Sequence, residues 1–233
     1  MKKIELLFPE LCNIYGESYN VEYLKRSNPD NIEVIETNHR DIPAFVKEGV
    51  DMVYLGCTTE RKQEIIIEIL KPYKERIKEL IDKNVIFLIT GNSVEIFGNY
   101  IKDEDRVIEA LGIFDFYSER YMKKDRHNSQ FIGKHEDLTL MGHRSQFSFA
   151  YGEFQNCFIN IEKGIGMNKE TKKEGIHVKN FFATYSLGPF LILNPYFAKQ
   201  LLSTMGLDDK LCFEKEIIEA YEYRLKELRR TIK

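Results

Sequence analysis

The sequence predicts an α/β protein with a doubly wound, mostly parallel sheet flanked by helices and a short antiparallel extension in its second half. Three observations support this prediction. Short apolar runs alternate with helical patterns in the first half, as in successive β-α-β units. Residues 85–89, VIFLI, form an unbroken apolar run, which is typical of a strand buried on both faces of a parallel sheet. The second half changes to short strand-like segments separated by charged turns, which favours antiparallel pairing.

The first half contains four expected strands, over residues 3–8, 31–36, 52–55 and 85–89. Residues 9–20 open a helix that is expected to run through Lys25. Between Glu60 and Lys83, isoleucine and leucine recur at helical spacing around Pro72, which predicts two helices or one kinked helix.

The second half contains expected short strands over residues 115–121, 130–133, 137–141 and 154–161. An apolar strand is predicted over 181–186, a helix begins at Asn194 and Pro195, and a charged amphipathic helix covers 213–233. The sequence has no internal repeat, low-complexity segment or linker, so we expect a single domain over residues 1–233.

The composition limits the function classes. A hydrophobic fraction of 43% and a charged fraction of 30% are ordinary for a globular protein. The net charge of -3, with basic and acidic residues interspersed, argues against a nucleic-acid partner. No window is long and apolar enough for a membrane span, and the four cysteines are far apart without a C-x-x-C pattern. We therefore expect a cytoplasmic protein with reduced thiols, no membrane contact, no metal and no cofactor.

The segment 84–98 has the pattern of a strand-turn-helix elbow. After the strand comes the small polar turn Thr90-Gly91-Asn92-Ser93, and a helix is expected from Val94 with Asn92 or Ser93 as its cap. In enzymes with this layout, the residue at the top of the turn is often a nucleophile in a strained conformation, at the carboxyl end of the sheet. In this sequence that residue is Gly91.

Four separated segments carry a family resemblance. They are NIYGESYN at 13–20, GCTTERKQ at 56–63, GNSVEIFG at 91–98, and TYSLGPFL at 184–191 followed by Asn194-Pro195. In order and spacing they resemble the patterns N-x-Y-G-D-x-G-N, G-G-G-Q-D-R-E-Q, C-G-G-Y-Q-L-L-G and T-Y-L-H-G-P-L-L of class I glutamine amidotransferases. Within the cobyric acid synthase branch, they are most similar to the glutaminase subunits of lipid II isoglutaminyl synthases. The resemblance spans residues from about 4 to 203 and implies the flavodoxin-like class I amidotransferase fold.

The resemblance also implies a chemistry and a departure from it. The family hydrolyses glutamine through a cysteine thiolate activated by a histidine, and the thioester breaks down to release ammonia to a synthetase partner. The alignment places Gly91 at the cysteine position and Leu187 at the histidine position. Glycine has no nucleophile and leucine cannot take a proton, so no Cys-His catalytic residues are expected. Glycine would also relieve the strain of the elbow, which costs other residues about 1–3 kcal/mol.

Ten residues are candidates for lining the pocket. Cys57 is the most plausible replacement nucleophile, since its loop opens on the same crevice, but a small buried thiol is the plainer interpretation. Ser93 is expected to cap the helix, and His143 and Arg144 lie in a predicted loop that resembles, less closely, the family segment G-F-E-N-H. Arg144 has the donors to bind a carboxylate, although a solvated arginine is the simpler expectation. The full set is Gly56, Cys57, Thr58, Gly91, Asn92, Ser93, Glu95, His143, Arg144 and Leu187.

Three functional hypotheses follow. The favoured one is a non-catalytic binding or regulatory module that pairs with a ligase- or synthetase-like partner and takes a small amide or carboxylate ligand. The second is an enzyme with altered chemistry that uses Cys57, His143 or Glu95 in new roles. The third keeps the family activity with a nucleophile from a partner chain. We favour the first because both members of the expected catalytic pair are absent together.

Overall fold

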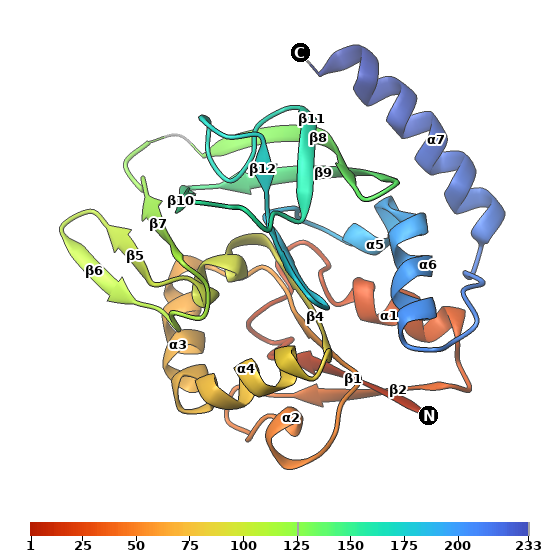
Figure 1. Cartoon of the computed structure of the whole chain (residues 1–233), viewed down its shortest axis with the longest axis horizontal. Helices are drawn as coiled ribbons and strands as arrows, with labels where there is room; N and C mark the ends of the chain where they lie inside the picture. The colour runs from red at the N-terminus through yellow and green to blue at the C-terminus, as the bar shows by residue number, and fades with distance from the viewer. Residues whose placement is uncertain (125, 233) are drawn as a thin grey trace.

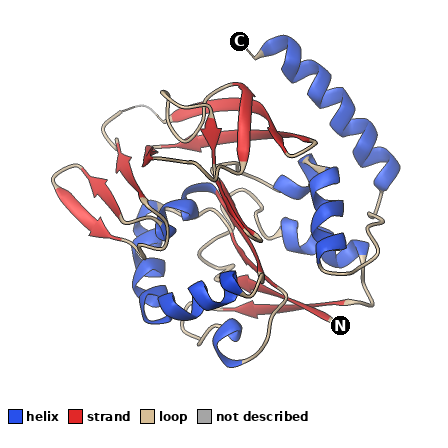
Figure 2. Ribbon diagram, in the orientation of Figure 1, coloured by secondary structure: helices blue, strands red, loops and turns tan. Residues whose placement is uncertain are grey.

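A six-stranded, mostly parallel sheet forms the centre of the protein (Figures 1 and 2). The computed structural model describes residues 1–124 and 126–232, so Lys233, the last residue of the predicted tail helix, lies outside the described residues. The strand order is β13-β14-β4-β3-β1-β2, and only the edge strand β13 is antiparallel to its neighbour. The strands are β1 (Lys2–Leu7), β2 (Ile32–Thr37), β3 (Met52–Leu55), β4 (Ile86–Thr90), β13 (Ile176–Val178) and β14 (Phe181–Thr184). The predicted parallel sheet is therefore confirmed.

Helices cover both faces of this sheet (Figure 1). Because successive side chains of a strand point to opposite faces, Phe87 and Ile89 of β4 pack with α3 and α4, while Ile86 and Leu88 pack with α1 and α6. Pro72 lies in a short 3₁₀ turn, Lys71–Tyr73, so the expected choice between one kinked helix and two resolves as two helices. The helices are α1 (Tyr19–Ser27), α2 (Ala44–Lys47), α3 (Glu60–Leu70), α4 (Lys74–Asp82), α5 (Phe190–Leu193), α6 (Pro195–Thr204) and α7 (Glu214–Thr231).

Two smaller sheets form the extension predicted in the second half (Figure 2). One has the order β10-β7-β5-β6, and the other has the order β12-β11-β8-β9. Most of their pairings are antiparallel, as predicted, but β5 and β7 are parallel. Their strands are β5 (Tyr100–Asp103), β6 (Arg106–Glu109), β7 (Phe116–Arg120), β8 (His127–His135), β9 (Leu138–Gln146), β10 (Ser148–Gly152), β11 (Ile159–Lys163) and β12 (Lys173–Glu174).

Several predicted boundaries are wrong in these smaller sheets. The predicted strand at 137–141 continues to Gln146, so His143 and Arg144 lie on β9 and not in a loop. The predicted strand at 154–161 begins only at Ile159. The hairpin β5–β6 and strand β10 were not predicted. In β5 only Ile101 is buried and Val107 of β6 is 66% exposed, so this hairpin lacks the alternating apolar signal.

Two further corrections concern helices. The first helix begins at Tyr19, because residues 9–18 form turns. The expected helix after the elbow turn is a 3₁₀ helix, η2 (Gly91–Phe97), that starts at Gly91 itself.

The tail helix α7 lies on the outside of the molecule and packs through Tyr221, Leu225 and Leu228 against Ile132 and Met141 (Figure 1). Among the described helices, none has the length and apolar character needed to cross a membrane.

Candidate functional site

The carboxyl ends of β3, β4 and β14 bring the candidate site together. β4 pairs with both of the other strands, so the loops that follow the three strands meet at one edge of the sheet. At the end of β4, Gly91 has a left-handed backbone with φ of +63°, and its N–H donates to the carbonyl of Ser186 at 3.1 Å. A glycine adopts this conformation without the steric cost that other residues bear.

Gly91, Cys57 and Leu187 are packed against one another. A Cβ atom added at Gly91 would lie 2.5 Å from Cys57 Cβ, 2.7 Å from Cys57 Sγ and 3.0 Å from Leu187 Cδ2. Real Cβ atoms do not approach other carbons this closely, so no side chain fits at Gly91 without displacing Cys57. The side chains of Cys57 and Leu187 therefore fill the space that a residue at the top of the elbow would need.

The thiol of Cys57 is buried and forms a hydrogen bond within the protein. Its Sγ donates to Asn92 Oδ1 at 3.3 Å. Burial, with a further contribution from the nearby Glu17 carboxyl, raises the pKa of the Cys57 thiol to about 12. The thiol is thus neutral at physiological pH, whereas a nucleophilic cysteine needs its thiolate. This environment is that of a structural thiol.

Asn92 and Ser93 tie the elbow to the loop after β3. Asn92 Oδ1 accepts a hydrogen bond from the backbone N–H of Thr58 at 3.0 Å, and Ser93 Oγ donates to the carbonyl of Gly56 at 2.6 Å. Neither side chain caps η2, because its N-cap is Thr90 without a side-chain cap bond, so the predicted cap role is wrong. The two polar side chains instead satisfy backbone groups of the neighbouring strand's loop.

Glu17 joins the loop before α1 to the ends of the strands. The carboxylate is fully buried and accepts from Thr90 Oγ1 at 2.6 Å, from Tyr54 Oη at 2.9 Å and from the N–H of Gly188 at 2.8 Å. Burial raises the pKa of Glu17, although these donors oppose the shift. Glu17 stands where the family pattern has aspartate, and this match is the signal that could have identified its position.

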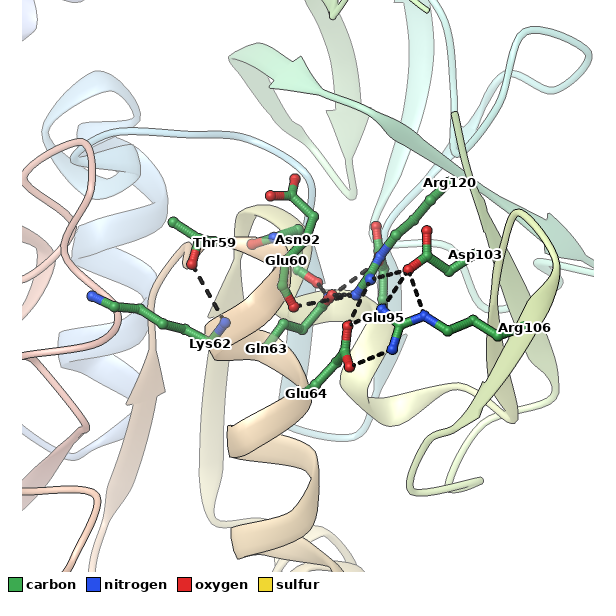
Figure 3. A network of polar contacts seen from close by, with 10 residues as sticks. All are labelled: Thr59, Glu60, Lys62, Gln63, Glu64, Asn92, Glu95, Asp103, Arg106 and Arg120. Carbon is green, nitrogen blue, oxygen red and sulfur yellow. Dashed lines mark hydrogen bonds and ion pairs between the residues drawn. The ribbon is translucent and has the colours of Figure 1, made fainter. Parts of the chain in front are cut away.

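Glu95 lies behind the elbow in a buried polar network (Figure 3). Its carboxylate accepts from Gln63 Nε2 and from Tyr185 Oη, each at 3.1 Å, and also from Ser148 Oγ. Burial raises the pKa of Glu95, and the positive charge of Arg120 opposes this shift. Through these three hydrogen bonds, Glu95 connects η2 to α3, β10 and the segment after β14.

The same network extends from Gln63 to the smaller sheet (Figure 3). Arg120 of β7 donates to the Gln63 side chain, to Glu64 Oε1 at 3.2 Å and to Asp103 Oδ2 at 3.1 Å. Arg120 is only 4% exposed, so these bonds pair Nη1 and Nη2 of a largely desolvated guanidinium. The elbow and the sheet β10-β7-β5-β6 are thus joined through α3.

Arg144 is neither solvated nor directed into the cavity, contrary to both expectations for it. Its guanidinium is fully buried, forms an ion pair with Glu174 at 3.0 Å, and lies over the rings of Phe131 and Tyr185. Glu174 also accepts from Thr184 Oγ1 at 3.0 Å and from the N–H of Tyr185 at 2.9 Å. The ion pair therefore supports the end of β14.

His143 contributes its backbone to the site. Its carbonyl accepts from the N–H of Leu187 at 2.8 Å. Its imidazole is half-buried, and burial followed by the charge of Arg224 on α7 lowers its pKa. The side chain is not among the residues that line the cavity beside Cys57.

A cavity of about 130 Å³ opens beside Cys57. Four of the ten predicted residues line it: Cys57, Thr58, Asn92 and Leu187. The other six predicted residues do not line the cavity. Four of them are buried and lie near lining residues in the sequence: Gly56, Gly91, Ser93 and Glu95. The remaining two are His143 and Arg144, described above. The lining residues that sequence reasoning missed include Arg126, which donates to Tyr15 Oη at 2.8 Å. The complete lining is Ile14, Tyr15, Cys57, Thr58, Thr59, Glu60, Asn92, Arg126, Ser145, Gln146, Phe147, Ser148, Tyr185 and Leu187.

The fold is that of the class I glutamine amidotransferases. The glutaminase domain of CTPS from Trypanosoma brucei, solved with bound acivicin, superimposes with a TM-score of 0.57. The match covers 92% of this chain and 99% of that domain at 8% sequence identity, so it establishes the fold alone.

Sequence comparison gives the family. Residues 3–194 match the CobB/CobQ-like glutamine amidotransferase domain, and the chain belongs to this family. The chain is 28% identical over 220 residues to the lipid II isoglutaminyl synthase (glutamine-hydrolyzing) subunit GatD of Staphylococcus aureus, covering 93% of this chain and 89% of the relative. It is 27% identical over 215 residues to the subunit of the same name from Streptococcus pneumoniae, covering 85% of this chain and 78% of the relative.

Proposed function

We propose that this chain is a non-catalytic binding or regulatory module with an amidotransferase fold that works beside a ligase- or synthetase-like partner. The observation that supports it most is the packing of Gly91, Cys57 and Leu187. The family resemblance assigns the nucleophile to position 91 and the histidine to position 187, and neither residue here has the chemistry for its role.

The geometry adds a steric argument to the chemical one. The side chain of Cys57 stands where the resembled loop has glycine, and it occupies the space beside Gly91. A nucleophile at the elbow would need this space. Three positions therefore differ together, which is the pattern expected if the site was repacked after its chemistry was no longer required.

The structure offers little support for altered chemistry in the same crevice. The Cys57 thiol has a pKa of about 12, and the Glu95 carboxylate is fully engaged by Gln63, Ser148 and Tyr185. The His143 imidazole does not line the cavity. Cys57 lines the cavity but its thiol stays protonated, Glu95 has no free oxygen to offer, and His143 lies outside the cavity lining.

The partner and the ligand are inferred from different observations. The two GatD relatives are named as subunits of a glutamine-hydrolyzing synthase, which supports a ligase-like partner for this chain. The 130 Å³ cavity, with the guanidinium of Arg126 and the amide of Asn92 in its lining, suits a small amide or carboxylate. We also propose a single domain over residues 1–233 and a cytoplasmic location, for which the free thiols of all four cysteines argue.

A glutaminase assay tests this proposal. Purified chain, alone and with any co-purifying partner, is incubated with glutamine, and glutamate release is measured beside the Cys57→Ala variant. We expect no release above the uncatalysed rate in any sample. Release by the wild-type chain that Cys57→Ala abolishes would overturn the proposal in favour of an altered enzyme.

A restoration experiment tests the alignment itself. The triple variant Cys57→Gly, Gly91→Cys and Leu187→His both clears the space at the elbow and supplies the two missing groups. We expect it to form a thioester with glutamine that mass spectrometry detects. The matched control retains Cys57 and carries only the other two substitutions, and we expect steric conflict with Cys57 to prevent the reaction or the folding of the elbow. A folded triple variant without any thioester would argue against the assigned positions.

A further inference from the structure

A second, larger cavity lies next to the one beside Cys57. It has a volume of about 550 Å³, within the size range of small-molecule sites. The two cavities share Arg126, Gln146 and Phe147 in their linings, so they adjoin. The four segments that carry the family resemblance contribute no residue to the larger cavity. Its lining is Tyr121, Lys124, Arg126, His127, Asn128, Gln146, Phe147, Phe149, Tyr151, Asn168, Lys169 and Glu170.

The charges in this cavity favour an anion. Among the described lining residues there are three cations and one carboxylate, Glu170. Burial, followed by the charges of Arg144 and Lys169, lowers the pKa of His127, so its imidazole is neutral at physiological pH. The positive charge therefore comes from Lys124, Arg126 and Lys169. Concentration of three cations in one cavity contrasts with a chain whose net charge is -3.

The walls of the cavity favour a planar ring. Each of the three cations lies over an aromatic ring: Lys124 over Tyr121 at 4.6 Å, Arg126 over Phe147 at 4.6 Å and Lys169 over Phe149 at 5.6 Å. Aromatic faces and guanidinium planes are the surfaces on which planar ring systems stack. The cavity thus combines stacking surfaces with positive charge.

A buried polar atom points to a ligand independently of the charges. Gln146 is 6% exposed, and its Nε2 donates to the carbonyl of Ser148. Its Oε1 is buried without a hydrogen-bond partner among the described residues, although the residue lines both cavities. An unsatisfied buried acceptor is costly, and an N–H or O–H donor of a ligand would satisfy it.

From this arrangement we propose that the larger cavity binds a small anionic ligand with a planar ring and a hydrogen-bond donor, the chemistry of a nucleotide. The phosphates lie against Lys124 and Lys169, the ring stacks on the aromatic wall, and a ring amine or ribose hydroxyl donates to Gln146 Oε1. Since Gln146 and Phe147 line both cavities, a ligand here contacts the walls of the site beside Cys57. This inference does not depend on the proposed loss of glutaminase activity.

Titration of the purified full chain with nucleotides tests the proposal. Calorimetry is performed with ADP, and with adenosine and pyrophosphate as probes of the ring and the anion alone. We expect ADP to bind at least tenfold more tightly than either part, and the affinity to fall with increasing salt. Absence of ADP binding at millimolar concentration, or ADP affinity no greater than that of pyrophosphate, would overturn the proposal.

Three variants locate the binding. Lys169→Gln removes a cation and should weaken ADP binding at least fivefold without lowering the melting temperature. Phe149→Leu removes a stacking face of a buried ring, so it should lower the melting temperature moderately and, while still folded, weaken ADP binding at least fivefold. The matched control is Lys210→Gln, an exposed lysine that lines neither cavity, and it should leave the affinity unchanged. If Lys169→Gln and Lys210→Gln have equal effects, binding is not in this cavity and the assignment is wrong.

Discussion

The tight packing around Gly91 predicts a specific energetic coupling with Cys57. In Gly91→Ala, the new Cβ would be 2.5 Å from Cys57 Cβ, and the left-handed φ of +63° would be retained by a residue that disfavours it. The conformational cost is about 1–2 kcal/mol, and overpacking of a core typically adds about 1–3 kcal/mol. We expect Gly91→Ala to reduce the free energy of unfolding by about 2–5 kcal/mol.

A double-mutant cycle separates the two costs. In a Cys57→Gly background the clash with Cys57 disappears and only the flexible end of Leu187, at 3.0 Å, must shift, so Gly91→Ala should cost about 1–2 kcal/mol. The coupling energy between positions 57 and 91 is then about 1–3 kcal/mol. Cys57→Ala is the matched control, because it removes Sγ at 2.7 Å but retains the Cβ at 2.5 Å, and it should rescue Gly91→Ala much less well.

Urea unfolding of the four proteins in each cycle measures these quantities, with unchanged m-values as the check that the states compared are the same. A coupling energy below about 0.5 kcal/mol would refute the reasoning, since distant, independent sites add within that margin. It would mean that Cys57 does not occupy the space beside Gly91.

Three further predictions test the network around the site. The raised pKa of Glu17 means that, between pH 4.5 and the folded pKa, the native state binds more protons than the unfolded state, so stability falls as pH rises across this window. Glu17→Gln should therefore lose less stability than the wild type between pH 4.5 and 8, as measured by urea unfolding at each pH. Arg144→Met leaves Glu174 as an unpaired buried charge and should cost about 3–5 kcal/mol in the free energy of unfolding. Arg120→Met removes the bonds from Arg120 to Gln63 and Glu64 of α3 and leaves the Arg106–Glu64 ion pair as a remaining link, and amide exchange of residues 100–109 should become at least tenfold faster.

Each of these predictions has its own control. Glu219 is exposed, so Glu219→Gln should leave the pH dependence unchanged; an equal effect of the two glutamine variants would contradict the role of Glu17. Adding Glu174→Gln to Arg144→Met removes the unpaired charge and should recover part of the lost stability. For Arg120, unchanged exchange in 100–109 beside a normal melting temperature would show that the hairpin is held by other contacts.

Sequence reasoning was most successful where local pattern and topology agree. The apolar run before Gly91 identified β4, and because the ends of neighbouring parallel strands converge, the loop of Cys57 was expected to open on the same crevice. Leu187 was added only by the family resemblance, and the structure packs it against Gly91. It failed where the decisive contact is non-local. The pairing of Arg144 with Glu174 joins residues on different strands, and nothing adjacent to either residue indicates a buried ion pair.

The hydrogen bonds of Glu17 set the order in which the site can form. Its three partners, Tyr54, Thr90 and Gly188, lie 37, 73 and 171 positions away in the sequence. Closing contacts over such separations is slow, because the entropy of each long loop is lost before the contact stabilises it. During synthesis, the Glu17 carboxylate cannot form all three hydrogen bonds until residue 188 has been made. The cavity beside Cys57 is therefore among the last features of the fold to form.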